Sequence, residues 1–193
     1  MPCLAISATT TAYGRQMIEA TRSWVQGEFC TARGRPADCE VIYGDTDSVM
    51  VNFKAGRRDL AVADVATAMA LGQEAAQLIS QKFPPPVKLE FEKVYYPYLL
   101  MNKKRYAGLL WTKPDKWDKM DSKGIETVRR DNCGLVRQVV ATCLDKILID
   151  RDEGAAVSYV KGVISDLLQN KVDMSLLVVT KVGVQGGGEV VRV

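Results

Sequence analysis

Apolar residues recur along much of the chain every three to four positions, which is the period of an α-helix with one buried face. The predicted helices cover residues 9–29, 61–82, 135–148 and 157–168. One of Thr9–Thr11 is suited to cap the first helix, and Pro84–Pro86 ends the second. The last two helices are joined by a short polar turn, which predicts an antiparallel helix pair.

Two other stretches favour strands. Val41–Tyr43 and Val49–Val51 are apolar and flank residues 44–48, which have the composition of a turn. They predict a tight hairpin with Asp45 and Asp47 at its tip. Because alternate residues of an extended segment project to the same side, the two carboxylates can converge on one point.

A second strand signal follows the triple proline. Leu89 and Phe91 alternate with Glu90 and Glu92, as in a strand with one buried face. Pro97 then predicts an edge strand or a bend.

Composition narrows the classes of function. The chain has 193 residues, 47% of them hydrophobic and 25% charged, as in an ordinary globular protein. No apolar run reaches membrane-spanning length, and no secretory signal pattern begins the sequence. The five Cys form no C-x-x-C pair, which predicts reduced thiols without a zinc ribbon. There is no His, so Ser-His and Cys-His hydrolase mechanisms are excluded within this chain.

Positive charge is concentrated in one segment. Residues 101–131 hold nine Lys or Arg and five Asp or Glu, a local charge of +4, which leaves −1 for the rest because the chain carries +3. A basic segment in a chain that also has a carboxylate turn is expected where phosphates pass a metal site. Residues 112–131 themselves predict a charged loop.

By spacing alone, the two tip aspartates leave three interpretations open. They solvate a turn, or they hold a nucleotide-sugar diphosphate through a metal, or they are the carboxylate pair of a polymerase. An EF-hand is excluded, because with Asp45 first the glycine position falls on Met50 and the glutamate position on Gly56. A nucleotide-sugar transferase would need a nucleotide-binding α/β half before the aspartates, for which forty residues are too few.

The full string decides between these interpretations. Tyr43–Ser48 (YGDTDS) between apolar strands resembles motif C of the family B DNA polymerases. The resemblance implies that Asp47 bridges two catalytic metal ions, both Mg²⁺, and that Asp45 lies beside it at the primer end. A metal-dependent nucleotidyl transfer would then extend a primer 3′-hydroxyl on a DNA template.

A second string supports the same family. Asn102–Gly108 (NKKRYAG) resembles its Lys-Lys-Arg-Tyr motif, which contacts the primer duplex from the minor groove. By this resemblance Lys104 makes the contact, with Lys103, Arg105 and Tyr106 supporting it. Minor-groove acceptors are present on every base pair, so a Lys there can test base-pair shape without reading sequence.

Three weaker strings extend the resemblance over about Pro2–Lys181. PCLAIS at 2–7 resembles the segment that follows motif B in the family. LEFEK at 89–93 resembles a palm strand, in which Glu90 or Glu92 is a candidate ligand of an accessory metal. KGIE with RRD, at 123–131, resembles the entry into the thumb. Arg129 and Arg130 either bind primer phosphates or form ordinary surface ion pairs.

The resemblance implies an α+β fold, an antiparallel palm sheet with packed helices followed by the helical start of a thumb. It divides the chain into the C-terminal part of a palm domain (residues 1–127) and the start of the thumb (128–181). The Gly-rich residues 182–193 are expected to be a disordered tail unrelated to the family. Met1 is then an internal position of the family or a product of a truncated gene model. The implied partners are primer-template DNA and a deoxynucleoside triphosphate, with a sliding clamp and accessory subunits bound through other parts, in the nucleus and away from membranes.

The motif A aspartate, the fingers and a proofreading exonuclease do not occur in this sequence, so we expect the chain to be inactive alone. A non-catalytic nucleic-acid-binding fragment is the alternative class.

Overall fold

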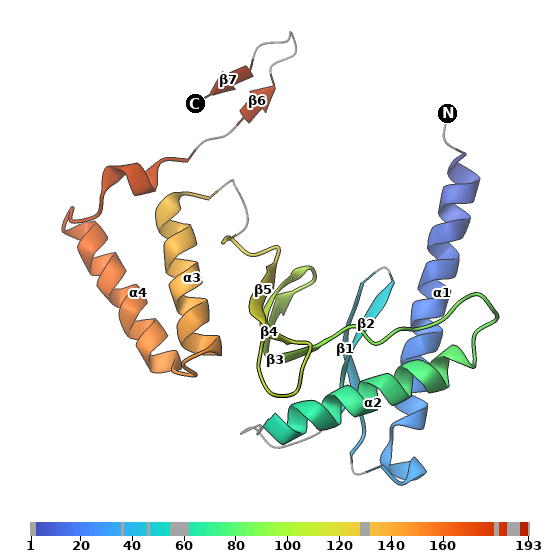
Figure 1. Cartoon of the computed structure of the whole chain (residues 1–193). Helices are drawn as coiled ribbons and strands as arrows, with labels where there is room; N and C mark the ends of the chain where they lie inside the picture. The colour runs from blue at the N-terminus through green and yellow to red at the C-terminus, as the bar shows by residue number, and fades with distance from the viewer. Residues whose placement is uncertain are drawn as a thin grey trace. The chain divides into compact units, whose positions relative to one another are not determined.

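The computed structural model of the chain describes residues 3–35, 37–45, 47–54, 62–127, 132–179, 182–184 and 190–192. These residues form helices and small separate sheets, which confirms the α+β class (Figure 1). The chain divides into two compact units. The first is Met1–Tyr96 with Leu110–Lys119, and the second is Pro97–Leu109 with Met120–Val193.

The first unit begins with helix α1, Leu4–Glu28, which starts five residues before the predicted position. Thr9, Thr10 and Thr11 do not cap it. Their hydroxyls donate to the carbonyl oxygens of the residues four positions earlier, at 2.8, 3.0 and 2.9 Å. A Thr hydroxyl that bonds back in this way is satisfied inside a helix, so the three Thr continue α1 and do not begin it.

Helix α2, Val62–Ser80, follows the predicted range and packs on the C-terminal half of α1. The buried core between them consists of Val25, Phe29, Cys39, Ala75 and Ile79. A hydrogen bond of 2.6 Å from Lys82 to Glu28 joins the ends of the two helices, and it lowers the pKa of the Glu28 carboxyl. Between α1 and the hairpin lies a 3₁₀ turn, η1 (Thr31–Arg33), closed by Gly34 in a left-handed conformation.

The predicted hairpin is confirmed. Strand β1 is Glu40–Asp45 and strand β2 is Ser48–Asn52, and they pair antiparallel. The register shifts between Val41 and Tyr43, so Ile42 is the extra residue of a β-bulge. A bulge increases the local twist of a hairpin, and this one lies close to the tip that carries the aspartates.

The strand predicted over Leu89–Lys93 is wrong. Residues 87–93 belong to no strand, although their side chains alternate between half-buried and exposed as predicted. The backbone N–H of Leu89 donates to the Ser80 hydroxyl at 2.8 Å, and the Leu89 carbonyl accepts from it at 3.1 Å. A side chain at the end of α2 therefore satisfies the groups that a neighbouring strand would otherwise bind.

The next sheet contains strands β3 (Val94–Asn102), β4 (Arg105–Trp111) and β5 (Lys119–Lys123) in that order. Pro97 lies in β3, an edge strand, which agrees with its predicted place. Strand β5 falls within residues 112–131, which were predicted to be loop, so that prediction was wrong for five residues. Short connections between neighbouring strands make this an antiparallel sheet.

The first unit has a second buried cluster, to which the end of β4 contributes. Trp111 forms a buried cluster with Val65 and Met69 of α2, and Trp117 packs against that cluster. The Trp111 indole N–H donates to the carbonyl of Tyr96 at 2.6 Å.

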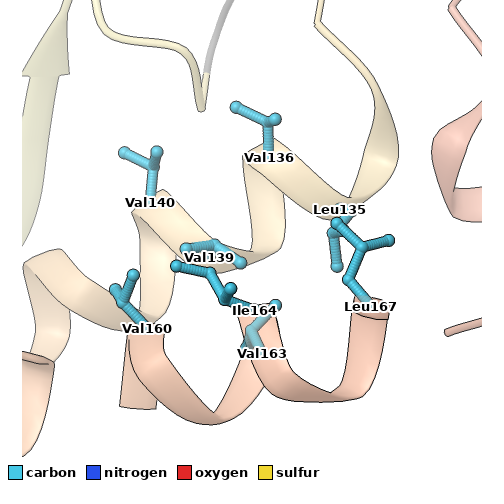
Figure 2. Close-up of a pocket in the computed structure, with 8 residues that line it drawn as sticks. All are labelled: Leu135, Val136, Val139, Val140, Val160, Val163, Ile164 and Leu167. Atoms are coloured by element: carbon cyan, nitrogen blue, oxygen red, sulfur yellow. The ribbon is translucent and has the colours of Figure 1, made fainter. Parts of the chain in front are cut away.

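The second unit contains the helix pair expected from the sequence, α3 (Gly134–Leu148) and α4 (Glu153–Leu168). Asp152 caps α4 by accepting from the N–H of Ala155 at 2.8 Å. A 3₁₀ turn, η2 (Met174–Leu177), packs on α3. Figure 2 shows the groove between the helices, which is lined only by aliphatic side chains: Leu135, Val136, Val139, Val140, Val160, Val163, Ile164 and Leu167.

The last described part of the chain contains two short strands. Val182–Val184 (β6) and Val190–Arg192 (β7) pair as short antiparallel strands. Residues 180–181, 185–189 and 193 lie outside the described residues, so the expected disorder of this tail stays a prediction.

Candidate functional site

The acidic hairpin tip lies where β1 turns into β2. Asp45 is the last residue of β1 and pairs with Ser48, while Asp47 lies in the turn itself. The Asp47 N–H and the Ser48 hydroxyl both donate to the Asp45 carbonyl oxygen, the second at 3.3 Å. The chain therefore bends sharply between the two aspartates, and the alternation of an extended strand does not apply at Asp47.

The carboxylates differ in their surroundings. Asp45 is half-buried and Asp47 is exposed. Among the described residues, nothing forms an ion pair or a hydrogen bond with the side chain of Asp47. An exposed carboxylate with no cation beside it suits a hard divalent ion, which prefers oxygen ligands and keeps several waters. These residues fit Mg²⁺ as part of a site.

Helix α1 and the core below it hold the hairpin. Val51 and Phe53 pack against the cluster that contains Val25 and Phe29, and the rings of Phe29 and Phe53 meet edge to face with centroids 5.3 Å apart. The base of the hairpin is thus fixed in a buried core, while the tip is exposed.

Glu90 and Glu92 are engaged by local partners. Glu90 accepts from Lys88 at 2.6 Å, which lowers the pKa of its carboxyl, and Glu92 lies 3.8 Å from Lys93. Within the described ranges, no three acidic, Cys or His side chains gather as a metal site would require. The accessory-metal role of Glu90 or Glu92 stays a prediction.

The basic turn lies in the second unit, between β3 and β4. Lys103 and Lys104 form the connection and both are exposed. Lys104 has φ 60°, in the left-handed region that disfavours a residue with a Cβ. Because both residues are exposed, the turn presents two cationic side chains at the surface, which suits contact with a phosphate-bearing partner.

The other two residues of the motif are anchored to the protein. Arg105 pairs through Nη2 with the Glu126 carboxylate, and its Nε is buried. The ring of Tyr106 lies 5.5 Å from that of Tyr98, on the adjacent strand. The prediction named Lys103, Arg105 and Tyr106 together as supports for Lys104, and the structure separates the exposed lysines from the anchored pair.

Arg129 and Arg130 lie outside the described residues, so their predicted role stays a prediction. Gly124 and Glu126, which follow β5, contact Lys104 and Arg105 of the turn. The sequence strings predicted no such contact for either residue. The only signal in the sequence is a Gly between Lys123 and Ile125, and a lone Gly does not indicate which segment it approaches.

The cysteines offer no alternative site. Burial raises the pKa of the Cys39 and Cys143 thiols, which disfavours the reactive thiolate. All five Cys are free of disulfides, as expected. None of the described helices is long and apolar enough to cross a membrane.

The acidic hairpin tip and the exposed lysine turn are the places where the strings YGDTDS and NKKRYAG lie in this α+β chain. The chain belongs to DNA polymerase family B, whose sequence model matches residues 1–186. The relatives that it resembles include DNA polymerase delta catalytic subunits of several organisms. It is 63% identical to that of Glycine max, 59% to that of Candida albicans and 59% to that of Drosophila melanogaster, each over 181 residues.

The matches cover 94% of this chain but 16–17% of those three relatives. The family match confirms the resemblance seen in the sequence, and it decides against the nucleotide-sugar transferase.

Proposed function

We propose that the chain is a segment of a DNA polymerase delta catalytic subunit that supplies one side of the metal site and a contact to the primer duplex. Residues 1–127 would be the C-terminal part of the palm and residues 128–181 the start of the thumb. The observation that carries the proposal is the exposed Asp47 carboxylate at the tip of a hairpin whose base is buried.

In this proposal, Asp47 and Asp45 hold two Mg²⁺ ions together with ligands from elsewhere in the enzyme. The ions, when bound, activate the primer 3′-hydroxyl and stabilise the charge of the leaving pyrophosphate. The task of this chain is positional: a rigid hairpin fixes the carboxylates before the reaction, so no reorganisation is needed when charge develops.

Lys104 would lie in the minor groove of the newly formed duplex. Its exposed ammonium can donate to acceptors that every correct base pair presents in the same place. Lys103, and Arg129 and Arg130 beyond the described residues, would neutralise phosphates. Neutralising phosphates strengthens binding without regard to sequence.

The proposal includes the partners that the family resemblance implies. They are primer-template DNA, a deoxynucleoside triphosphate, and a sliding clamp with accessory subunits bound through regions outside this chain. The location would be the nucleus, where chromosomal DNA is copied.

A second candidate is a fragment that binds nucleic acid without catalysis. It is favoured by the exposed lysine turn, which lies in a different unit from the aspartates and needs no metal to attract a phosphate backbone. The two candidates differ in whether Asp47 matters for primer extension.

The test uses a chimera in which the matching part of this chain replaces its counterpart in the Glycine max relative. Asp47→Ala should lower primer extension by roughly a hundredfold or more, since a lost metal ligand removes several kcal/mol of transition-state stabilisation. Duplex binding should change little. Asp115→Asn, which removes an exposed carboxylate of no assigned role, is the control, and near-normal extension by the Asp47 variant would refute the proposal.

A further inference from the structure

The segment Gly124–Glu126, after strand β5, lies against the lysine turn. A Cβ on Gly124 would be 2.1 Å from the carbonyl oxygen of Lys104 and 3.3 Å from a side-chain carbon of Arg105. The first separation is far below any real contact of a Cβ. The two backbones thus meet at a place where only Gly fits.

Gly124 also needs its own backbone conformation. Its φ is +63°, which residues with a side chain rarely adopt. The next residue, Ile125, is completely buried, so its side chain anchors the segment. A rigid backbone therefore lies behind the carbonyl of Lys104.

Glu126 completes the contact. Its carboxylate accepts from Nη2 of Arg105, and the two side chains are 29% and 42% exposed. Charge-assisted bonds to a planar guanidinium fix direction as well as distance. Glu126 therefore balances the charge of Arg105 within the protein.

We propose that Gly124 and Glu126 are positioning residues that hold the turn in the shape that presents Lys104, and that Arg105 links the turn to Glu126 and does not bind phosphate. The left-handed backbone of Lys104 is disfavoured on its own and persists only where its surroundings enforce it. Gly124 supports its carbonyl, and the Arg105–Glu126 pair fixes the residue that follows it. This inference rests on the proposed function, in which Lys104 contacts the primer duplex.

The experiment measures primer extension and salt-dependent duplex binding by the same chimera carrying Glu126→Gln, Arg105→Met and both changes together. If the pair positions Lys104, each single variant should lose roughly tenfold in extension from a paired primer end. The double variant should lose no more than a single one, because both changes remove the same link. Extension from a mismatched end should change less, as in a variant lacking Lys104 itself.

A role as phosphate ligand predicts the opposite pattern. Arg105→Met would then lower the slope of log affinity against log salt by about 0.9, and Glu126→Gln would free Arg105 and tighten binding. Such opposite signs would overturn the inference. So would equal losses on paired and mismatched primers, which indicate only a general loss of structure.

Matched variants separate charge from position. Asp115→Asn removes one negative charge from the same basic region without touching the turn, and it should leave the paired-to-mismatched ratio unchanged. Glu126→Asp keeps the charge, and partial recovery relative to Glu126→Gln supports positioning. Gly124→Ala should reproduce the loss of discrimination, and normal discrimination in that variant would contradict the contact with Lys104.

Failure of this inference is distinguishable from failure of the proposed function. If Asp47→Ala leaves extension intact, the proposed function fails. If Asp47→Ala abolishes extension while the Glu126 and Arg105 variants extend normally, the proposed function stands and the positioning role is wrong.

Discussion

Lys104 combines an unfavourable backbone with an exposed cationic side chain. Its left-handed φ of 60° costs roughly 1–2 kcal/mol for a residue with a Cβ. Gly, which adopts that conformation freely, does not occupy the position. Because a Lys occupies a position whose backbone suits Gly, the side chain of Lys104 is the part of the residue to test.

We predict that Lys104→Ala in the chimera weakens extension from a paired primer end much more than from a mismatched one. A lost contact to a paired end costs roughly 1–3 kcal/mol, or about ten- to hundredfold in rate. A mismatch already displaces the acceptor, so little remains to be lost there. Extension rates on both primers across a salt series measure the difference.

Lys103→Ala is the matched control, because it removes the same charge from the same turn. It should weaken extension from both primers equally, and raised salt should mimic it. Lys104→Gly relieves the backbone and should still show the selective loss. An equal loss in all three variants would leave Lys104 as one charge of a plain basic edge.

Among the elements, the contact of helix α2 with Phe91 depends on a single Gly. A Cβ on Gly72 would lie 2.6 and 2.7 Å from two carbons of the Phe91 ring. That ring packs against the buried cluster of Val65, Met69 and Trp111. The helix approaches residues 87–93 this closely because position 72 has no side chain.

We predict that Gly72→Ala destabilises the first unit by about 1 kcal/mol. Overpacking costs roughly 1–3 kcal/mol, and the better helix propensity of Ala returns about 1 kcal/mol. All three Trp of the chain lie in this unit, so urea unfolding followed by Trp fluorescence reports on it alone. Gly27→Ala in α1, where no atom lies within 4 Å of the new Cβ, is the control and should be neutral or stabilising.

A stabilising Gly72→Ala would contradict the close packing of α2 on Phe91. It would show that the ring moves aside at little cost, and that residues 87–93 are held mainly by the bonds of Leu89 to Ser80.

For the molecule as a whole, the proposed chemistry is divided between the two units. The aspartates belong to the first unit and the lysine turn to the second. The described residues gather no three potential metal ligands, whereas a pair of catalytic ions needs more oxygen ligands than two carboxylates provide.

We predict that this chain alone, purified free of other polymerases, shows no templated incorporation with Mg²⁺, while the chimera extends primers. The matched relatives are about six times longer than the aligned region, which is 16% of the Glycine max protein, and the remaining ligands would come from there. Incorporation of labelled nucleotide on a primed template measures it. Templated synthesis that Asp47→Ala abolishes would show that the chain is sufficient by itself.

The sequence by itself determined the features that depend on neighbours along the chain. The helical periods, the hairpin around Asp45 and Asp47 and the edge position of Pro97 are local, because periodicity and turn composition act over a few residues. The strings YGDTDS and NKKRYAG indicated the family because each is a run of neighbouring residues that can be recognised without the fold. The candidate functional residues within them could be named before their geometry was known.

Only the tertiary structure decided what distant residues do to one another. Ser80 satisfies the backbone of Leu89 nine residues away, which removes a strand that the alternation predicted. Glu126 binds Arg105 across 21 positions, and Gly124 touches Lys104, so two anchored members of the basic motif differ from its two exposed lysines. These contacts arise from how the chain folds back on itself, and a pattern of residue types carries no record of which segments then meet.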